Sequence, residues 1–196
     1  MIISKKLSKF KGINHAFFNQ LGGHSSGIYK SLNCGLNSSD SKKNILKNLE
    51  IVKKKVGSGL NKIVFLNQIH SNKLYYIDKK VKLSNKIFAG DALITNRPNT
   101  PIAILTADCA PILIFDEKSK IVAAVHAGWK GAYKGIIKKV IRFMIKKGSS
   151  TNSITAAIGP CISLKSYEVK QNFIKKFIEK DIKNKVFFKK VRNKSY

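Results

Sequence analysis

Apolar residues recur at helical spacing in two long segments of the chain. Residues 41–56 and 131–147 place apolar side chains three or four positions apart among lysines, which predicts two amphipathic helices. Asp40 or Ser41 is the expected N-cap of the first helix, and Gly57 is expected to end it. A third helix is expected over residues 171–180. The side chains expected to face inward are Ile45, Leu49, Val52 and Val56 in the first helix and Ile136, Ile137, Val140, Ile141, Met144 and Ile145 in the second.

Short apolar runs predict β-strands in the rest of the chain. The runs are KIVFLNQIH, DALITN, PIAILTAD, PILIFD, IVAAVHAG and SITAAIGP, and Pro, Gly, Asn or Asp residues bound them. Several are almost continuously apolar, which indicates strands that are buried on both faces. Residues 19–40, rich in Gly, Ser and Asn, are expected to form a loop. The pattern therefore predicts an α/β (α+β) fold, with a layered, mixed β-sheet core flanked by helices.

The length and composition narrow the class of protein. A chain of 196 residues with 43% hydrophobic residues is expected to form a single domain over residues 1–196. The first ten residues, MIISKKLSKF, lack the apolar stretch of a signal peptide, and no segment is long and apolar enough for a membrane span. Three cysteines far apart in the sequence argue against a disulfide framework. A cytoplasmic protein without a membrane partner is expected.

The strongly basic balance raises the possibility of a nucleic-acid partner. The chain has 38 basic and 10 acidic residues, a net charge of +28. Only three of the basic residues are arginines, whose planar fork is the usual group for base and phosphate recognition, and the lysines are spread along the whole chain. Lys, Asn and Ile, which all have A/T-rich codons, are enriched together. No specific nucleic-acid partner is therefore expected.

Three potential metal ligands stand at the ends of predicted strands. His70, Cys109 and His126 each follow an apolar run and precede a turn, where a rigid strand holds a side chain that the loop leaves accessible. Two imidazoles and a thiolate suit zinc, and three protein ligands leave a fourth position open, as in catalytic sites. The spacing matches no local metal motif, so ordinary structural roles for these residues stay open. His15, Cys34 and Cys161 are expected to be structural. A structural role is also favoured for His24, although its Gly-flanked loop leaves an approach to a substrate open.

Several strings of residues occur together in one order. They are GGHSSGIYKSLNCG, NQIHS, GDALITN, TADCAPILIFD, VAAVHAGWKG and AAIGPCI followed by YEV, and they extend from about residue 17 to residue 169. In this combination the chain resembles the laccase-domain family, the YfiH-like proteins formerly called multicopper polyphenol oxidases. The resemblance implies the YfiH-like α/β fold and a zinc ion held by His70, Cys109 and His126.

The resemblance also implies an activity. Proteins of this family act as purine nucleoside phosphorylases on adenosine, inosine, guanosine and methylthioadenosine, and they deaminate adenosine, so purine nucleosides and phosphate are the expected partners. Four histidines are too few for the copper centres of a multicopper oxidase, so Zn²⁺ is expected rather than copper. Asp108 is the candidate proton shuttle beside a ligand, and the backbone N–H groups of Gly22 and Gly23 are candidates for binding phosphate.

Two departures from the family pattern leave alternatives open. Gln20 stands where the family usually has an arginine, and the chain stops at Tyr196, so it is expected to be a C-terminally shortened member. One alternative is a metal-free cysteine hydrolase in which Cys109 is the nucleophile and His126 the base. Another is an inactive, truncated zinc-binding member of the family.

Overall fold

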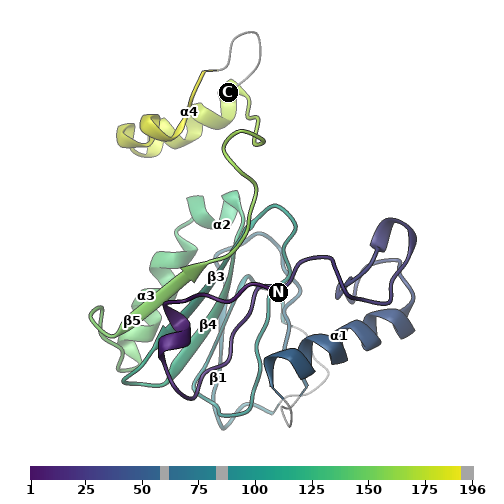
Figure 1. Cartoon of the computed structure of the whole chain (residues 1–196). Helices are drawn as coiled ribbons and strands as arrows, with labels where there is room; N and C mark the ends of the chain where they lie inside the picture. Colours follow the sequence, from purple (N-terminus) through teal and green to yellow (C-terminus); the bar gives the residue numbers. More distant parts are fainter. Residues whose placement is uncertain (58–61, 83–87, 191–196) are drawn as a thin grey trace. The chain divides into compact units, whose positions relative to one another are not determined.

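The structure, a computed structural model, describes residues 1–57, 62–82 and 88–190. It divides into two compact units, Met1–Pro160 and Cys161–Tyr196, and the larger unit contains the sheet (Figure 1). Whether the two units form the single domain predicted over residues 1–196 stays a prediction. The chain end at Tyr196 lies outside the described residues.

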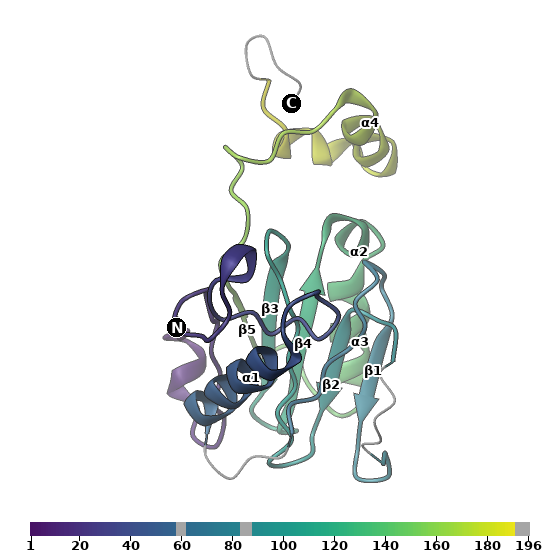
Figure 2. The same ribbon diagram turned by 90° about the vertical axis from the view of Figure 1, so that its right-hand side faces the viewer.

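The larger unit is built on a mixed sheet of five strands. Their bounds are Leu74–Ile77 (β1), Ala92–Thr95 (β2), Ala110–Asp116 (β3), Ile121–Ala127 (β4) and Ile154–Ile158 (β5). Their order across the sheet is β1-β2-β4-β3-β5. Strands β1 and β2 are parallel, and the other pairs are antiparallel, as Figure 2 lets the reader follow. The predicted α/β (α+β) fold with a mixed sheet core is confirmed.

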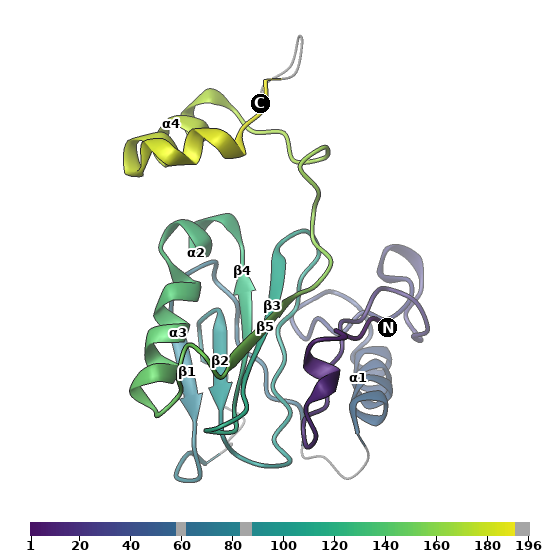
Figure 3. The same cartoon turned by 60° about the vertical axis from the view of Figure 1, so that its left-hand side comes forward.

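Helices cover the two sides of the sheet. Helices α2 (Trp129–Tyr133) and α3 (Ile136–Lys146) lie on one side, and α1 (Lys42–Val56) lies with the N-terminal segment on the other (Figure 3). The N-terminal segment includes two short 3₁₀ helices, η1 (Leu7–Lys9) and η2 (Gly27–Tyr29).

Burial on both faces explains the almost continuous apolar strands. In β2, Ala92 and Ile94 belong to the core cluster that includes α3, whereas Leu93 belongs to a second cluster with Leu66 and Ile77. All four residues of β2 are buried. Successive side chains of a strand point to opposite faces of the sheet. A strand is therefore buried at every position only when both faces of the sheet are covered.

The predicted helix over residues 131–147 is two helices. Gly135 separates α2 from α3 and has a φ of +75°, a left-handed conformation that interrupts a right-handed helix and that glycine adopts without strain. Ile136, Val140 and Met144 are fully buried, but Ile137 and Ile145 are about 40% exposed, so the inward role predicted for these two was wrong. Each follows a buried residue directly and is therefore rotated by about 100° away from the core.

Two of the predicted strands are extended loops. Residues 62–70 and 101–108 pair only through single parallel bridges, Val64 with Ile102 and Asn67 with Ala89, so the strand prediction was wrong for both runs. Their apolar residues cover the second face of the sheet instead, where Leu66, Val64 and Ile102 pack around Leu93. The edge strand β1 was not predicted.

Helix α1 begins after Ser41 and ends at Gly57, as predicted, and it anchors the loop before it. Ile45 is buried, but so is Asn48, which the apolar pattern did not predict to face inward. The Asn48 side chain accepts a hydrogen bond from the N–H of His24 at 2.7 Å and donates to Ser25 Oγ at 2.9 Å and to the carbonyl of Asn33 at 2.8 Å. The Gly- and Ser-rich loop is therefore held by one buried amide.

The smaller unit contains α4 (Gln171–Lys180), at the predicted bounds, and the 3₁₀ helix η3 (Ile182–Phe187). Tilted and edge-on ring contacts among Phe173, Phe177 and Phe188 hold it together. Among the described residues of the whole chain, no helix combines the length and the apolar character needed to cross a membrane.

Candidate metal centre

The structure brings together the three residues that the sequence predicts as ligands. His70 lies in the turn before β1, Cys109 stands directly before β3, and His126 lies in the last part of β4. Because β3 and β4 are antiparallel with Pro111 opposite His126, the start of β3 lies beside the end of β4. The candidate ligand atoms of the three side chains all lie within 4.8 Å of one another. Together they could hold a metal ion.

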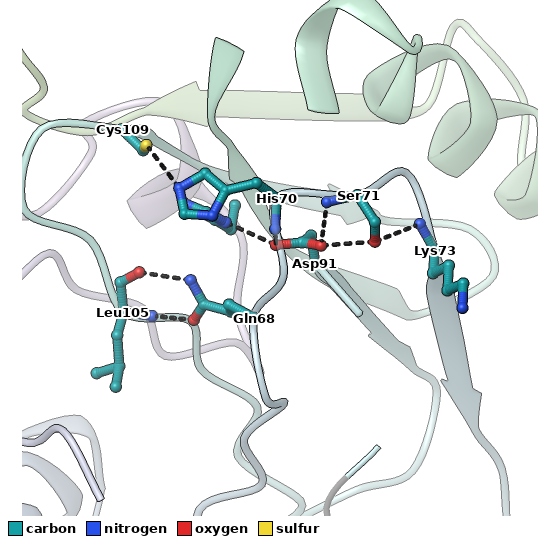
Figure 4. A network of polar contacts seen from close by, with 8 residues as sticks. Gln68, His70, Ser71, Lys73, Asp91, Leu105 and Cys109 are labelled. Carbon is teal, nitrogen blue, oxygen red and sulfur yellow. Dashed lines mark hydrogen bonds and ion pairs between the residues drawn. The ribbon is translucent and has the colours of Figure 1, made fainter. Parts of the chain in front are cut away.

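The cluster is buried on one side and open on the other. His126 is 3% exposed, Cys109 is partly buried, and His70 is exposed. The Cys109 Sγ lies 3.8 Å from His70 Nε2 (Figure 4). The imidazole rings of His70 and His126 meet edge to face with their centroids 4.8 Å apart. An ion bound here would contact the buried His126 on its inner side and would be accessible to solvent on the side of His70.

Asp91, the first polar residue before β2, binds to two of the three ligand residues. Its carboxylate is fully buried and accepts hydrogen bonds from His126 Nδ1 at 2.8 Å and from the N–H of His70 at 3.0 Å. The other carboxylate oxygen accepts from the N–H and the hydroxyl of Ser71, both at 2.6 Å (Figure 4). The sequence pattern predicts no role for Asp91. The available signal was a carboxylate placed directly before a fully buried strand, where an ion needs partners.

The electrostatics of the cluster act in opposite directions on the two acids. Burial raises the pKa of Asp91, but the hydrogen bonds from Ser71 and His126 lower it by more than burial raises it. The net shift of the pKa is downward, so the carboxylate is ionised at neutral pH. Burial raises the pKa of the Cys109 thiol, and the negative charges of Asp108 and Asp91 raise it further. A thiolate at Cys109 therefore needs a nearby cation, whereas a free nucleophilic cysteine needs a lowered pKa.

Two features hold the ligand-bearing loops in place. His70 has a φ of +54°, an uncommon conformation for a residue with a side chain, and its N–H is held by Asp91. The Gln68 side chain donates to the carbonyl of Leu105 and accepts from its N–H, both at 2.7 Å (Figure 4). This pair of bonds ties the loop that carries His70 to the loop that leads to Cys109.

Gly128 has no side chain, and the space that a side chain would need is occupied by His70 and Cys109. A Cβ atom at this position would lie 2.8 Å from Cδ2 of His70 and 3.0 Å from Sγ of Cys109. At Gly131, a Cβ would lie 2.8 Å from the carbonyl oxygen of Ser71. The start of α2 therefore packs directly against the ligands. A thiol and two imidazoles in this arrangement fit the donor preferences of a transition metal of the zinc class.

The remaining predicted site residues lie outside the cluster. Asp108 is exposed beside Cys109, and its role as a proton shuttle stays a prediction. The N–H of Gly23 donates to Ser31 Oγ at 3.1 Å, so this donor is already engaged within its own loop. Gly22 has a φ of +88°, and phosphate binding at Gly22 and Gly23 stays a prediction.

Two of the residues expected to be structural, His15 and Cys34, have surroundings that fit this role. Nε2 of His15 accepts from the N–H of Ser4 at 3.0 Å. Burial raises the pKa of Cys34 to about 11, so this thiol is inert at neutral pH.

Comparisons with known proteins place this geometry in a family. The family described as Multi-copper polyphenol oxidoreductase laccase matches residues 14–196. A purine nucleoside phosphorylase of Rickettsia prowazekii is 34% identical over 178 residues, which cover 91% of this chain and 70% of that protein. A purine nucleoside phosphorylase of Bacteroides thetaiotaomicron is 33% identical over 184 residues, 90% of this chain and 68% of that protein.

A solved structure agrees with these relatives. The crystal structure of the hypothetical protein YfiH of Bacillus licheniformis superposes with a TM-score of 0.81 and 30% identity, over 90% of this chain and 69% of that one. The chain spans between 50% and 70% of the length of the first curated relatives that it matches. With the family matched over most of its residues and the fold shared, this chain belongs to the Multi-copper polyphenol oxidoreductase laccase family, the laccase-domain family to which its sequence strings pointed.

Proposed function

We propose that this protein is a zinc-dependent purine nucleoside phosphorylase. The proposed substrates are phosphate and adenosine, inosine, guanosine or methylthioadenosine, with deamination of adenosine as a side activity. The observation that carries the proposal is the meeting of His70, Cys109 and His126, whose ligand atoms lie within 4.8 Å of one another. The names of the relatives from R. prowazekii and B. thetaiotaomicron support the reaction class.

The chemistry of the three donors favours zinc. His70, Cys109 and His126 would hold the ion, and a zinc ion with three protein ligands supplies Lewis-acid polarisation and an acidified water. The raised pKa of Cys109 supports a role as a metal ligand rather than as a free nucleophile, because a metal stabilises the thiolate that the apo protein disfavours.

The protein's own residues supply the rest of the proposed chemistry. Phosphorolysis requires the sugar carbon and phosphate to be held together while the base leaves, so orientation of the two substrates is the main task. We assign the orientation of phosphate to the backbone at Gly22 and Gly23, where the N–H of Gly23 would exchange its bond to Ser31 Oγ for one to phosphate. We assign proton transfer to Asp108, which is exposed next to the cluster. Gln20, in the same loop, cannot supply the charge-assisted contact of an arginine, which lowers the expected turnover.

Two other functions make different demands on the same residues. The cysteine hydrolase requires Cys109 as a thiolate with a base beside it. The Cys109 Sγ lies 3.8 Å from His70 Nε2, but the pKa of the thiol is raised, which disfavours the thiolate. The inactive zinc-binding protein requires the same cluster without turnover. A cytoplasmic location and small-molecule partners complete the proposal.

Turnover of nucleosides with phosphate tests the proposal. Zinc-loaded protein is incubated with adenosine or inosine and phosphate, and free base, ribose 1-phosphate and inosine are quantified separately. We expect phosphate-dependent release of free base that a chelator and His126→Ala both abolish. Gln20→Arg, which alters no proposed ligand, should increase the rate. Folded protein that binds zinc but releases neither free base nor inosine contradicts the enzyme and leaves the inactive zinc-binding protein. Turnover that survives complete removal of zinc favours the hydrolase.

A further inference from the structure

We infer that Asp91 is the positioning residue of the cluster: one buried carboxylate sets the tautomer of His126 and the backbone position of His70, and thereby sets the affinity of the site for zinc. This inference rests on the proposed metal site and deepens it. Asp91 belongs to none of the three ligand positions and would act through the ligands.

All four groups around the carboxylate are hydrogen-bond donors. They are the N–H of His70, the Nδ1–H of His126, and the N–H and hydroxyl of Ser71. The Ser71 hydroxyl oxygen accepts from the N–H of Lys73 at 3.1 Å, which leaves its proton for Asp91. The backbone of Asp91 is also engaged, since its carbonyl accepts from the N–H of His126 at 2.8 Å and its N–H donates to Lys73. The buried Asp91 carboxylate is therefore held between its own segment, residues 70–73 and His126.

The contact with His126 determines which ring nitrogen is free for a metal. A carboxylate can only accept, so Nδ1 of His126 carries a proton and Nε2 keeps its lone pair for the ion. A histidine oriented by a carboxylate in this way is a better ligand, because its tautomer and ring plane are set before the metal binds.

The contacts with residues 70 and 71 act on the second ligand. The positive φ of His70 is an uncommon conformation for a residue with a side chain, and two successive N–H groups directed at one carboxylate stabilise it. The same carboxylate therefore couples the positions of two candidate ligands, His70 and His126, that lie 56 positions apart in the sequence. The charges also balance, since Zn²⁺, the Cys109 thiolate and the Asp91 carboxylate sum to zero.

Asp91→Asn is the direct test, because an amide cannot accept on both sides. If its oxygen faces His126, its NH₂ group faces the N–H of Ser71. If it is reversed, its NH₂ group faces Nδ1 of His126 and selects the tautomer with a proton on Nε2, which cannot bind metal. We expect the zinc affinity, measured by competition with a chromophoric chelator, to fall about 10- to 100-fold.

Asp116→Asn is the matched control. Asp116 is also a fully buried carboxylate, but it lies at the opposite end of β3 from Cys109, six residues beyond Ala110. At about 3.4 Å per residue, this places it roughly 20 Å away along the strand. The control variant should lose stability but keep its zinc affinity within about 2-fold of the wild type.

A second measurement needs no variant. In metal-free, ¹⁵N-labelled wild-type protein at about pH 8, long-range ¹H–¹⁵N correlations report the tautomer of each imidazole. We expect His126 to carry its proton on Nδ1. A proton on Nε2, or an Asp91→Asn variant that binds zinc as tightly as the wild type, overturns the role of Asp91. Wild-type protein that fails to bind zinc refutes the proposed function instead, and the tautomer of His126 still decides the structural claim.

Discussion

Gly128→Ala should separate metal affinity from folding stability. Gly128 has a φ of −68° and a ψ of 160°, which alanine adopts freely, so the substitution carries no backbone cost. The new methyl group would lie 2.8 Å from His70 Cδ2 and 3.0 Å from Cys109 Sγ. Ordinary contacts begin near 3.5 Å, so one or both side chains must move by about 0.5–1 Å. Metal–ligand distances tolerate only about 0.2 Å.

The cost should fall on the metal-bound state. Without metal, the exposed His70 side chain can turn away from the methyl group, and the free energy of unfolding should change by less than about 1 kcal/mol. With metal, His70 and Cys109 must stay in place, and overpacking costs of about 1–3 kcal/mol correspond to a loss of zinc affinity of about 5- to 150-fold.

Gly148→Ala provides the opposite control. Its methyl group would meet nothing within 4 Å, but its φ of +100° makes a side chain strained. It should lower the free energy of unfolding by about 1–2 kcal/mol and leave the zinc affinity unchanged. Denaturant unfolding of metal-free protein and chelator competition measure the two quantities. The reasoning is refuted if Gly128→Ala binds zinc like the wild type, or if both variants lose affinity in parallel.

Three further predictions concern acid stability, thiol reactivity and charge. Burial raises the pKa of Asp116, but hydrogen bonds from Ser149, Lys118, Ser119 and Ser153 lower it to about 2. Its stabilisation is therefore present above the unfolded pKa near 4 and lost as the pH falls from about 4 to 2. The stability lost by Asp116→Asn at pH 7, about 2–3 kcal/mol, should disappear over that interval in urea titrations. Iodoacetamide at pH 8 should alkylate the exposed Cys161 well before Cys34, whose pKa burial raises to about 11; equal rates in a mass-spectrometric time course would contradict this burial. DNA binding should be weak, independent of sequence and lost steeply with added salt, so sequence-selective binding in a filter assay near physiological salt would disprove the interpretation of the lysines.

The three candidate metal ligands could be picked out from the sequence because their positions follow a local rule and because the strings that contain them resemble the laccase-domain family. His70, Cys109 and His126 each stand at the end of an apolar run, and donors at such places often meet at one edge of a fold. Asp91 could not be assigned in the same way, because its role consists of contacts with residues about 20 and 35 positions away. Its position directly before a buried strand indicates that the carboxylate needs partners, but it does not indicate which residues supply them.

The helical or extended character of each segment follows from its own residues. Periodic apolar positions set α1 and α4, with Ser41 and Gly57 as the ends of α1, because a helix is held by bonds between residues four apart. The tertiary structure decided which apolar extended runs became strands. Residues 62–70 and 101–108 have the composition of strands, yet they serve as cover for the second face of the sheet. Burial depends on the apolar character of a segment, whereas strand pairing depends on a partner backbone that only the assembled fold supplies.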